Sequence, residues 1–328
     1  MTGRARDDNA AGSKELHGVI VVDKPAGCTS FDVVRKVRRA LKVRKVGHTG
    51  TLDPLATGVL PLCLNEATKA AGFLAGDDKE YRAVMELGVA TDTQDITGTV
   101  VMRRDPRGIT RSDVETAAQS FLGTIRQKVP RYSAAKYRGR PYYRWARQGV
   151  DVDTPEKEVT IHEIEIESFS FPSATFRVLC SKGTYIRALC DDIGERLGCG
   201  AVLTGLRRTR SGAFREEDAL PLDRVAVAAD STLVRNIVIP LKNLMGEYAA
   251  VPVDRDSARK IRDGRQPTRG FFEGAAFPEV QRGELVRLTA EDDEIVAVAR
   301  VLLSPGEFAA AGDTEQVLRL VRVFNGEN

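Results

Sequence analysis

Residues 47–61, GHTGTLDPLATGVLP, form a loop in which glycines and prolines surround one carboxylate, that of Asp53. Glycine permits backbone angles and close approaches that other residues cannot adopt, and Pro54 fixes its own φ and disfavours helical geometry at Asp53. The loop is therefore predicted to be a stiff turn from which Asp53 projects. An isolated Asp-Pro pair more often caps a turn through its side chain. Here glycines and prolines fix the backbone on both sides of the carboxylate, and chemistry at Asp53 is the best reason for such an arrangement.

The composition fits a soluble globular protein. The chain has 328 residues, of which 42% are hydrophobic and 29% charged, and its length predicts about two domains. No apolar run approaches the roughly 20 residues that span a bilayer, and residues 1–16 are not signal-like. We therefore expect a cytoplasmic protein without membrane contact. Five cysteines without a Cys-x-x-Cys pair and only three histidines predict neither a zinc site nor a disulfide framework.

Basic residues are concentrated in two runs, although the net charge is only +3. Residues 33–48 carry seven lysines and arginines without an acid, and residues 126–147 carry eight together with four tyrosines and the only tryptophan. A charged run alone is usually a solvated surface, but cations neutralise phosphates and aromatic faces stack on unpaired bases. The second run is therefore predicted to bind RNA. Its candidate contacts are Arg126, Lys128, Arg131, Tyr132, Lys136, Tyr137, Arg138, Arg140, Tyr142, Arg144 and Arg147.

Hydrophobic periodicity predicts an α+β protein. Strands are expected at 18–22, 59–64, 80–87, 158–168 and 174–180, and helices at 30–41, 66–74, 112–122 and 184–197. The first helix should begin at an N-cap, Ser30, and bury a stripe that starts at Phe31. Beyond Met245, short strands at 285–288, 295–303 and 317–324 predict a small β-rich domain.

Three segments follow from these patterns. Residues 1–16 are expected to be a disordered tail, residues 17–245 a catalytic domain, and residues 246–328 a C-terminal domain. Within the second, residues 126–150 hold too much Gly, Pro and Arg for a core element. They are predicted to form a long RNA-gripping excursion.

Four further strings accompany the Asp53 loop and resemble, in the same order, the motifs of the TruB family of tRNA pseudouridine synthases, in its bacterial stand-alone form. They are GVIVVDKPAGCTS (18–30), KEYR (79–82), YSAAKYRGRPYYRWARQG (132–149) and CSKGTYIR (180–187) with LRR (206–208). The resemblance covers about residues 17–215. It implies the pseudouridine synthase fold, a mixed and largely antiparallel central sheet with flanking helices. The C-terminal region resembles a PUA domain, which would bind RNA.

The family reaction converts a T-loop uridine of tRNA, uridine 55, to pseudouridine. The N-glycosidic bond is cut, the uracil turns, and it is rejoined through carbon. The base must first be flipped out of the loop at a cost of roughly a few kcal/mol. The resemblance therefore implies tRNA, through its T arm, as the partner, with no obligate protein partner. No cofactor is expected, and the chain has neither a Walker A string nor a well-formed dinucleotide fingerprint.

The resemblance also implies catalytic roles. Asp53 would be the nucleophile and Arg187 the arginine that pairs with it, although an i,i+4 pair with Asp191 is the ordinary alternative. Tyr81 would stack on the flipped uracil and is a candidate acceptor for its C5 proton. A phenol, with a reference pKa of about 10, is a poor base near neutral pH, so direct and water-assisted transfer both stay open.

The remaining site residues carry weaker predictions. By resemblance, His48 holds the base everted, and Tyr185 and Leu206 line the uracil pocket, with core packing as their alternative. Lys24 and Lys69 would bind phosphate or organise the site, unless they are solvated lysines. Asp92 and Asp95 lie outside the catalytic string and are expected to have turn roles.

Two rival functions remain. A guide-RNA-dependent relative of the Cbf5 or dyskerin kind shares the catalytic core and a terminal PUA domain, whereas the basic aromatic run resembles the stand-alone enzymes. A non-catalytic RNA chaperone that helps tRNA to fold is compatible with every basic residue. The intact set of Asp53, Tyr81 and Arg187 favours catalysis.

Overall fold

The computed structural model describes residues 16–76, 78–229, 232–273 and 277–325. The predicted tail lies outside these residues, with the exception of Leu16. The Leu16 carbonyl accepts a hydrogen bond from Asn65 Nδ2 at 2.9 Å, and its side chain packs against the main core. The first described residue therefore already belongs to the fold.

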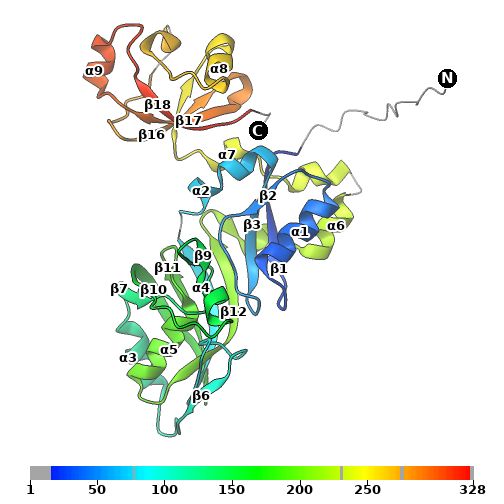
Figure 1. Ribbon diagram of the computed structural model, residues 1–328, viewed down its shortest axis with the longest axis vertical. Coiled ribbons are helices and arrows are strands. Elements are labelled where there is room, and N and C mark those ends of the chain that lie inside the picture. The colour runs from blue at the N-terminus through cyan, green and yellow to red at the C-terminus, as the bar shows by residue number, and fades with distance from the viewer. Residues whose placement is uncertain (1–15, 77, 230–231, 274–276, 326–328) are drawn as a thin grey trace, which may run out of the picture.

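The described chain builds two main sheets along one long axis (Figure 1), besides two small two-stranded sheets, and the largest sheet contains ten strands among the described residues. Its order is β14-β1-β3-β12-β4-β11-β10-β7, with β2 beside β3 and β13 beside β12. All neighbouring strands in it are antiparallel except the pairs β1–β14 and β3–β12. The predicted α+β class, with a mixed and largely antiparallel central sheet, is confirmed. The strands are β1 Gly18–Lys24, β2 Val46–His48, β3 Thr57–Leu64, β4 Lys79–Leu87, β7 Gly123–Lys128, β10 Glu156–Ser170, β11 Ser173–Cys180, β12 Ala201–Ser211, β13 Phe214–Arg215 and β14 Leu220–Pro221.

Helices flank this sheet. Helix α5 packs on β12 and β4, α3 packs on β10 and α5, and α1 packs against α6 near β1. The helices associated with the large sheet are α1 Ser30–Ala40, α2 Ala71–Leu74, α3 Arg111–Gln119, α5 Ile186–Arg196, α6 Leu222–Ala229 and α7 Leu241–Leu244, with short 3-10 turns at Asn65–Lys69, Glu216–Asp218 and Thr232–Ile237. None of the helices in the described ranges is long and apolar enough to cross a bilayer.

The hydrophobic pattern of β4 positions Tyr81. Alternate residues of this strand are buried, from Lys79 through Tyr81 to Leu87, as a period of two requires. The pattern was less accurate for α1. Thr29, not Ser30, caps the helix through a capping box with Asp32, and Phe31 is 64% exposed. The predicted apolar stripe was wrong at Phe31 because the buried face runs through Val33 instead.

Strand β12 was not predicted, although it lies at the centre of the sheet between β3 and β4. Its second half contains the polar run 207–211, RRTRS, which lacks the alternation of a half-buried strand. Tertiary contacts bring these arginines into the fold: Arg207 forms ion pairs with Asp23 and Glu216, and Arg208 bonds to backbone carbonyls. Local pattern could not reveal partners more than 140 residues away.

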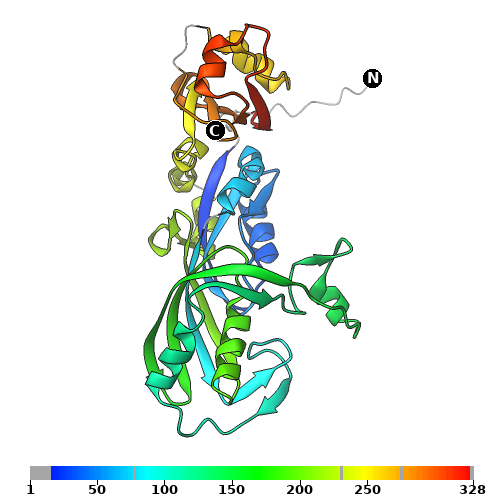
Figure 2. The same ribbon diagram turned by 90° about the vertical axis from the view of Figure 1, so that its left-hand side faces the viewer.

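Figure 2 shows a green segment that projects from the large sheet between β7 and β10. It contains the hairpin β8 Lys136–Tyr137 and β9 Arg140–Pro141, followed by helix α4 Tyr142–Ala146. We call residues 129–155 the thumb. The predicted start at 126 was wrong because Arg126 and Lys128 belong to β7, where they pair with β10 in the main sheet.

The second sheet, at the other end of the molecule, has the order β15-β16-β17-β18. Its strands are Ala249–Pro252, Leu285–Thr289, Ile295–Val301 and Leu318–Val323, accompanied by α8 Arg255–Arg262, α9 Pro305–Ala310 and 3-10 turns at Arg269–Phe272 and Glu291–Asp293. The predicted β-rich character of the C-terminal region is confirmed. We call residues 249–325 the C-terminal unit.

Candidate active site

The Asp53 loop, residues 49–56 between β2 and β3, is held by neighbours on several sides. Ser30 Oγ accepts a hydrogen bond from the Leu52 amide at 2.9 Å and donates to the Leu52 carbonyl at 3.2 Å. The Gly27 amide donates to the Pro54 carbonyl at 2.9 Å, and the Ala56 amide to the Asp53 carbonyl at 3.0 Å. The stiff turn predicted from glycine and proline is therefore also braced from the start of α1.

Lys24 organises the same loop. Its side chain is fully buried, and Nζ donates to the carbonyls of Ala56 at 2.6 Å, Pro25 at 3.0 Å and Pro54 at 3.3 Å. An ammonium group has three donors, and these carbonyls occupy them all. The solvated alternative and phosphate binding were both wrong for this lysine, whereas the predicted structural role fits.

A cavity of about 290 Å³ opens beside Asp53. Its lining comes from the Asp53 loop, from β4 and β12, and from residues 182–187 at the start of α5. It brings together Asp53, Tyr81, Arg187, Tyr185 and Leu206, which are separated by up to 153 positions in the sequence. Further lining residues are Thr49, Gly50, Thr51, Leu52, Ala75, Lys79, Ala134, Lys182, Gly183, Thr184, Ile186 and Arg208.

Arg187 is the cation nearest to the Asp53 carboxylate. It lies in the first turn of α5, is 4% exposed, and places Nε 3.6 Å from Asp53 Oδ2. Its Nη1 lies 3.9 Å from Asp95 Oδ2, and Nη2 donates to the Tyr132 carbonyl at 2.6 Å. One guanidinium thus connects the nucleophile candidate with a second carboxylate and with the base of the thumb.

The structure also shows the contacts of Asp191, the alternative partner of Arg187, and of Asp92 and Asp95, which were expected in turns. Asp191 accepts a hydrogen bond from Gln94 Nε2 at 2.7 Å, so the alternative of an i,i+4 pair with Arg187 was wrong. Asp92 and Asp95 accept backbone hydrogen bonds within the loop between β5 Val89–Thr91 and β6 Val100–Arg103, which confirms their turn roles. The approach of Asp95 to Arg187 was not predicted.

Burial dominates the ionisation of Asp53. Desolvation raises the pKa of its carboxyl above the ordinary value, the nearby Asp95 charge raises it further, and the Arg187 and Lys24 cations oppose the shift. The sequence argument considered only the favourable effect of Arg187. The net direction is upward, so the fraction of ionised Asp53 depends on pH closer to neutrality than for an exposed aspartate.

Tyr81 and His48 border Arg208. Burial raises the pKa of the Tyr81 phenol above its usual value, and the nearby Arg208 guanidinium acts in the opposite direction. The imidazole of His48 has a lowered pKa because of burial and the nearby Arg208 charge. Both groups are therefore neutral near pH 7. His48 Nδ1 has no hydrogen-bond partner in the described part of the chain, and the residue lies just outside the cavity lining.

Lys69 lies away from the cavity. Its Nζ donates to Glu66 Oε2 at 2.7 Å and to the Val323 carbonyl at 3.0 Å, so it joins the large sheet to the C-terminal unit. The predicted role in organising the site was wrong for Lys69, because its ammonium bonds to Glu66 and to the Val323 carbonyl on β18 instead.

The thumb has a small aromatic core of its own. Tyr142 is 5% exposed, and the ring centroid of Tyr137 lies 6.0 Å from that of Tyr142 and 6.3 Å from that of Trp145. Arginines cover the outer faces, with Arg138 over Tyr137 and Arg140 over Trp145 at 5.2 and 4.7 Å. The prediction that Tyr142 contacts RNA was wrong in this conformation, because the ring packs inside the thumb. The exposed candidates are Lys136, Arg138, Arg144 and Arg147, with Arg126, Lys128 and Arg131 exposed at its base.

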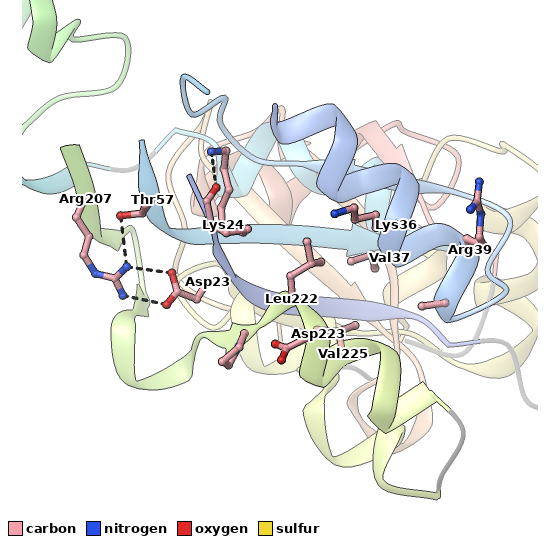
Figure 3. Close-up of a pocket in the computed structure, with 13 residues that line it drawn as sticks. Asp23, Lys24, Lys36, Val37, Arg39, Thr57, Arg207, Leu222, Asp223 and Val225 are labelled. Atoms are coloured by element: carbon pink, nitrogen blue, oxygen red, sulfur yellow. Dashed lines mark hydrogen bonds and ion pairs between the residues drawn. The ribbon is translucent and has the colours of Figure 1, made fainter. Parts of the chain in front are cut away.

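A second cavity, of about 730 Å³, lies between α1, α6 and the end of β1 (Figure 3). Arg207 Nη1 and Nη2 each lie 3.1 Å from an Asp23 carboxylate oxygen, and Arg207 Nε also bonds to Glu216. Arg207 thus pairs with two carboxylates at a partly exposed position, and Asp53 does not line this cavity. The smaller cavity is therefore the candidate reaction site.

Comparison with protein families agrees with this geometry. Residues 38–186 match the model of the TruB family pseudouridylate synthase N-terminal domain, and residues 187–245 match that of the tRNA pseudouridylate synthase B C-terminal domain. The chain belongs to the TruB family of pseudouridylate synthases. Members of this family are isomerases, which is the enzyme class predicted from the motifs.

Curated TruB relatives match nearly the whole chain. The tRNA pseudouridine synthase B of Syntrophus aciditrophicus strain SB is 46% identical over 94% of this chain and 99% of its own length. That of Geobacter sulfurreducens is 42% identical over 94% of this chain and its entire length. A chain of a solved Cbf5–Nop10–Gar1 complex has a similar structure, with a TM-score of 0.71, 27% identity, and coverage of 95% of this chain and 86% of that one.

The roles of two residues at this site were not predicted from the sequence. Ser30 was predicted only as a helix cap, yet its hydroxyl braces the Asp53 loop. Arg208 belongs to the LRR string (206–208) but received no role, although it lines the cavity beside Tyr81. The available signal for Arg208 was its position inside a family motif, as a polar residue to which no function had been given.

Proposed function

We propose that this chain isomerises the T-loop uridine of tRNA, uridine 55, to pseudouridine, in the cytoplasm. The observation that carries the proposal is the Asp53 carboxylate beside the buried Arg187 in a cavity that Tyr81, Tyr185 and Leu206 also line. The size of the cavity suits a single flipped nucleoside, as base chemistry on a folded loop requires. The names of the curated relatives support tRNA as the substrate.

The proposed reaction balances without a cofactor. Asp53 attacks C1′ or assists elimination at the sugar while the bond from C1′ to N1 breaks, as carboxylates do against cationic sugar transition states. The uracil turns, and C5 bonds to C1′ as the bond from Asp53 to C1′ breaks or, after elimination, as C2′ regains the proton that it lost. The C5 proton then leaves, and N1 ends protonated. Substrate and product are isomers. Because the Tyr81 phenol is neutral with a raised pKa, a free phenolate is scarce, and C5 deprotonation through Tyr81 requires proton transfer concerted with another acceptor or water.

Recognition is assigned to two surfaces. The exposed lysines and arginines of the thumb would hold the backbone of the T arm, with His48 holding the flipped conformation. Residues 246–328 would form a PUA-like RNA-binding domain, and residues 17–245 the catalytic domain. The Tyr132 carbonyl accepts a hydrogen bond from Arg187 and so links the base of the thumb to Asp53 through that arginine.

The guide-dependent alternative rests on the Cbf5 likeness, which is supported by lower identity than the likeness to the bacterial relatives. The chaperone alternative uses the same basic surface without Asp53. Modification of a single tRNA position without any guide RNA would distinguish the proposal from both of these alternatives.

The test is to incubate the purified protein with an unmodified tRNA transcript, without any guide RNA, to tag pseudouridine selectively with a carbodiimide, and to map the tagged position by mass spectrometry. A matched transcript carries cytidine in place of the T-loop uridine. We expect one pseudouridine, at the T-loop position, in the first transcript and none in the second. Modification elsewhere, or none without a guide, would contradict the proposal.

A further inference from the structure

Arg208 holds both catalytic elements of the proposed site. It lies on β12, is 1% exposed, and lines the cavity. Its Nε donates to the Val59 carbonyl on β3 at 2.7 Å, and Nη2 donates to the Gly50 carbonyl at 3.2 Å, three residues before Asp53. Tyr81 is the residue opposite Arg208 in the β4–β12 ladder, and the guanidinium lies close enough to the phenol to lower its pKa. A single side chain thus connects the Asp53 loop with β3 and lies beside Tyr81.

The charge of Arg208 is not neutralised by an acid. Within the described ranges no carboxylate forms an ion pair with it, and carbonyl and phenol oxygens are its neighbours. Burying a charge without a counter-ion is costly, and an apolar side chain would fill the same volume without that cost. A stability role alone is therefore a poor account of an arginine at this position.

The Arg208 guanidinium limits the hydrogen-bonding role of the Tyr81 hydroxyl. A guanidinium can only donate, so toward Arg208 the Tyr81 oxygen can act only as an acceptor, and the phenol hydrogen is left for another acceptor. The charged groups around the phenol are Arg208 on β12 and Asp53 on its loop, and the Cys180 thiol on β11 is also close. Of these, Arg208 is the group that favours a negative charge on the phenol oxygen.

The backbone around Arg208 leaves little room for movement. Gly58 has φ +99°, and a Cβ there would lie 2.3 Å from the Arg208 carbonyl. A Cβ on Gly50 would lie 3.4 Å from Arg208 Nη1. The loop and β12 therefore approach each other more closely than larger residues would allow.

We propose that Arg208 is a positioning residue that acts through Tyr81. It holds the Tyr81 phenol oxygen and the Asp53 loop in a fixed arrangement relative to the flipped uridine. The inference rests on the proposed function. Misplacement of a reacting group by about 1 Å can cost on the order of 100-fold in rate. Arg208→Met should therefore slow the chemical step by about 10- to 100-fold and leave tRNA affinity within about twofold of the wild type.

The experiment measures single-turnover tritium release from tRNA labelled at uridine C5, together with tRNA affinity and the thermal midpoint. The variants are Arg208→Met, Tyr81→Phe and the double variant, with Arg207→Met as the matched control on the same strand. We expect the Arg208 effect to shrink or vanish in the Tyr81→Phe background and Arg207→Met to react at nearly the wild-type rate. Arg208→Lys replaces Arg208→Met should the latter fail to fold, because one ammonium cannot reach all three partners in the same geometry.

A second measurement does not depend on residual activity. In protein labelled with carbon-13 at tyrosine Cζ, the Tyr81 resonance, identified by its absence from Tyr81→Phe, should move in Arg208→Met and stay in place in Arg207→Met. An unmoved resonance, an unchanged rate, a loss confined to tRNA affinity, or an equal loss in the Tyr81→Phe background would overturn the inference. A wild-type protein without tritium release would instead contradict the proposed function, and the resonance would still test the contact.

Discussion

At the scale of single residues, the site depends on opposing effects on Asp53. Burial and the Asp95 charge favour the protonated acid, whereas Arg187 and Lys24 favour the carboxylate, and burial is the largest effect. Catalysis requires the carboxylate, so the same burial that strengthens electrostatic interactions in the cavity also reduces the ionised fraction at low pH. The balance makes activity sensitive to neighbours that never touch the substrate.

The single-turnover rate should fall as pH decreases through a pKa above the ordinary aspartate value, because protonation removes the nucleophile. Asp95→Asn removes a negative charge that raises this pKa, and its remaining oxygen can still accept the turn hydrogen bonds. The inflection should therefore move to lower pH, as measured by rate profiles from about pH 4.5 to about pH 8. Asp92→Asn, in the same turn, is the control and should leave the inflection unmoved. An upward shift in Asp95→Asn would contradict this account of Asp53.

Some residues of the site could be predicted from the sequence, and the contacts of others could not. Asp53, Tyr81, Tyr185, Arg187 and Leu206 were expected to meet, and the cavity brings them together. The sequence could not show that the Lys24 ammonium is saturated by carbonyls or that Lys69 faces the C-terminal unit, because both depend on long-range contacts.

At the scale of elements, the thumb shows how composition can mislead. Alternating tyrosines and arginines predicted rings free to stack on bases. In the structure several rings pack on one another and are covered by arginines, so the aromatic groups give the thumb a fold and the cations face outward. Aromatic contacts outside the main core can order a short hairpin that would otherwise be marginal.

Tyr142→Ala should disorder the thumb without unfolding the large sheet. Removing a buried aromatic ring costs about 3 kcal/mol or more, and here the loss falls on a segment that projects from the sheet. We expect faster tryptic cleavage within residues 129–155, weaker tRNA binding and a nearly unchanged global midpoint. Tyr143→Ala, whose ring is less buried, is the control and should cleave more slowly than Tyr142→Ala. Equal cleavage in both variants would contradict an aromatic core built around Tyr142.

Element prediction succeeded where alternation was regular and failed where partners were distant. Strand β4 shows the expected period of two, and Gly198, with φ +76°, follows the C-cap of α5 as predicted. Strand β12 carries Gly205 and a run of arginines whose acceptors lie on other strands. A propensity argument could not identify it as the central strand.

At the scale of the whole molecule, the two sheets share one apolar cluster. Phe324, Ile295 and Val298 of the C-terminal unit belong to the same cluster as Ala67 and Leu74 on the side of the large sheet. Polar contacts flank it: the Asn325 amide donates to Glu66 Oε2 at 2.8 Å, and Lys69 reaches the Val323 carbonyl. The interface therefore holds the C-terminal unit in a fixed orientation relative to the large sheet, as an RNA-binding surface on both would require.

Phe324→Ala should loosen both sides of this interface. A fully buried phenylalanine truncated to alanine costs about 3 to 5 kcal/mol, and its loss should raise hydrogen exchange in residues 65–74 as well as in β17. Phe272→Ala removes an equally buried ring from a cluster confined to the C-terminal unit, so residues 65–74 should stay protected. Unchanged exchange at residues 65–74 in Phe324→Ala would show that the two units are energetically independent.

The central claim is that Asp53 carries out chemistry on a T-loop uridine of tRNA. The most direct test is tritium release from an unmodified tRNA transcript labelled at uridine C5, compared between the wild type and Asp53→Asn, with tRNA affinity measured on the same preparations. We expect the wild type to release the label of one uridine per tRNA, and Asp53→Asn to release none while its affinity stays within about twofold, because the amide keeps the side chain's shape without its nucleophile. Release by Asp53→Asn, or loss of binding together with release, would contradict the role assigned to Asp53.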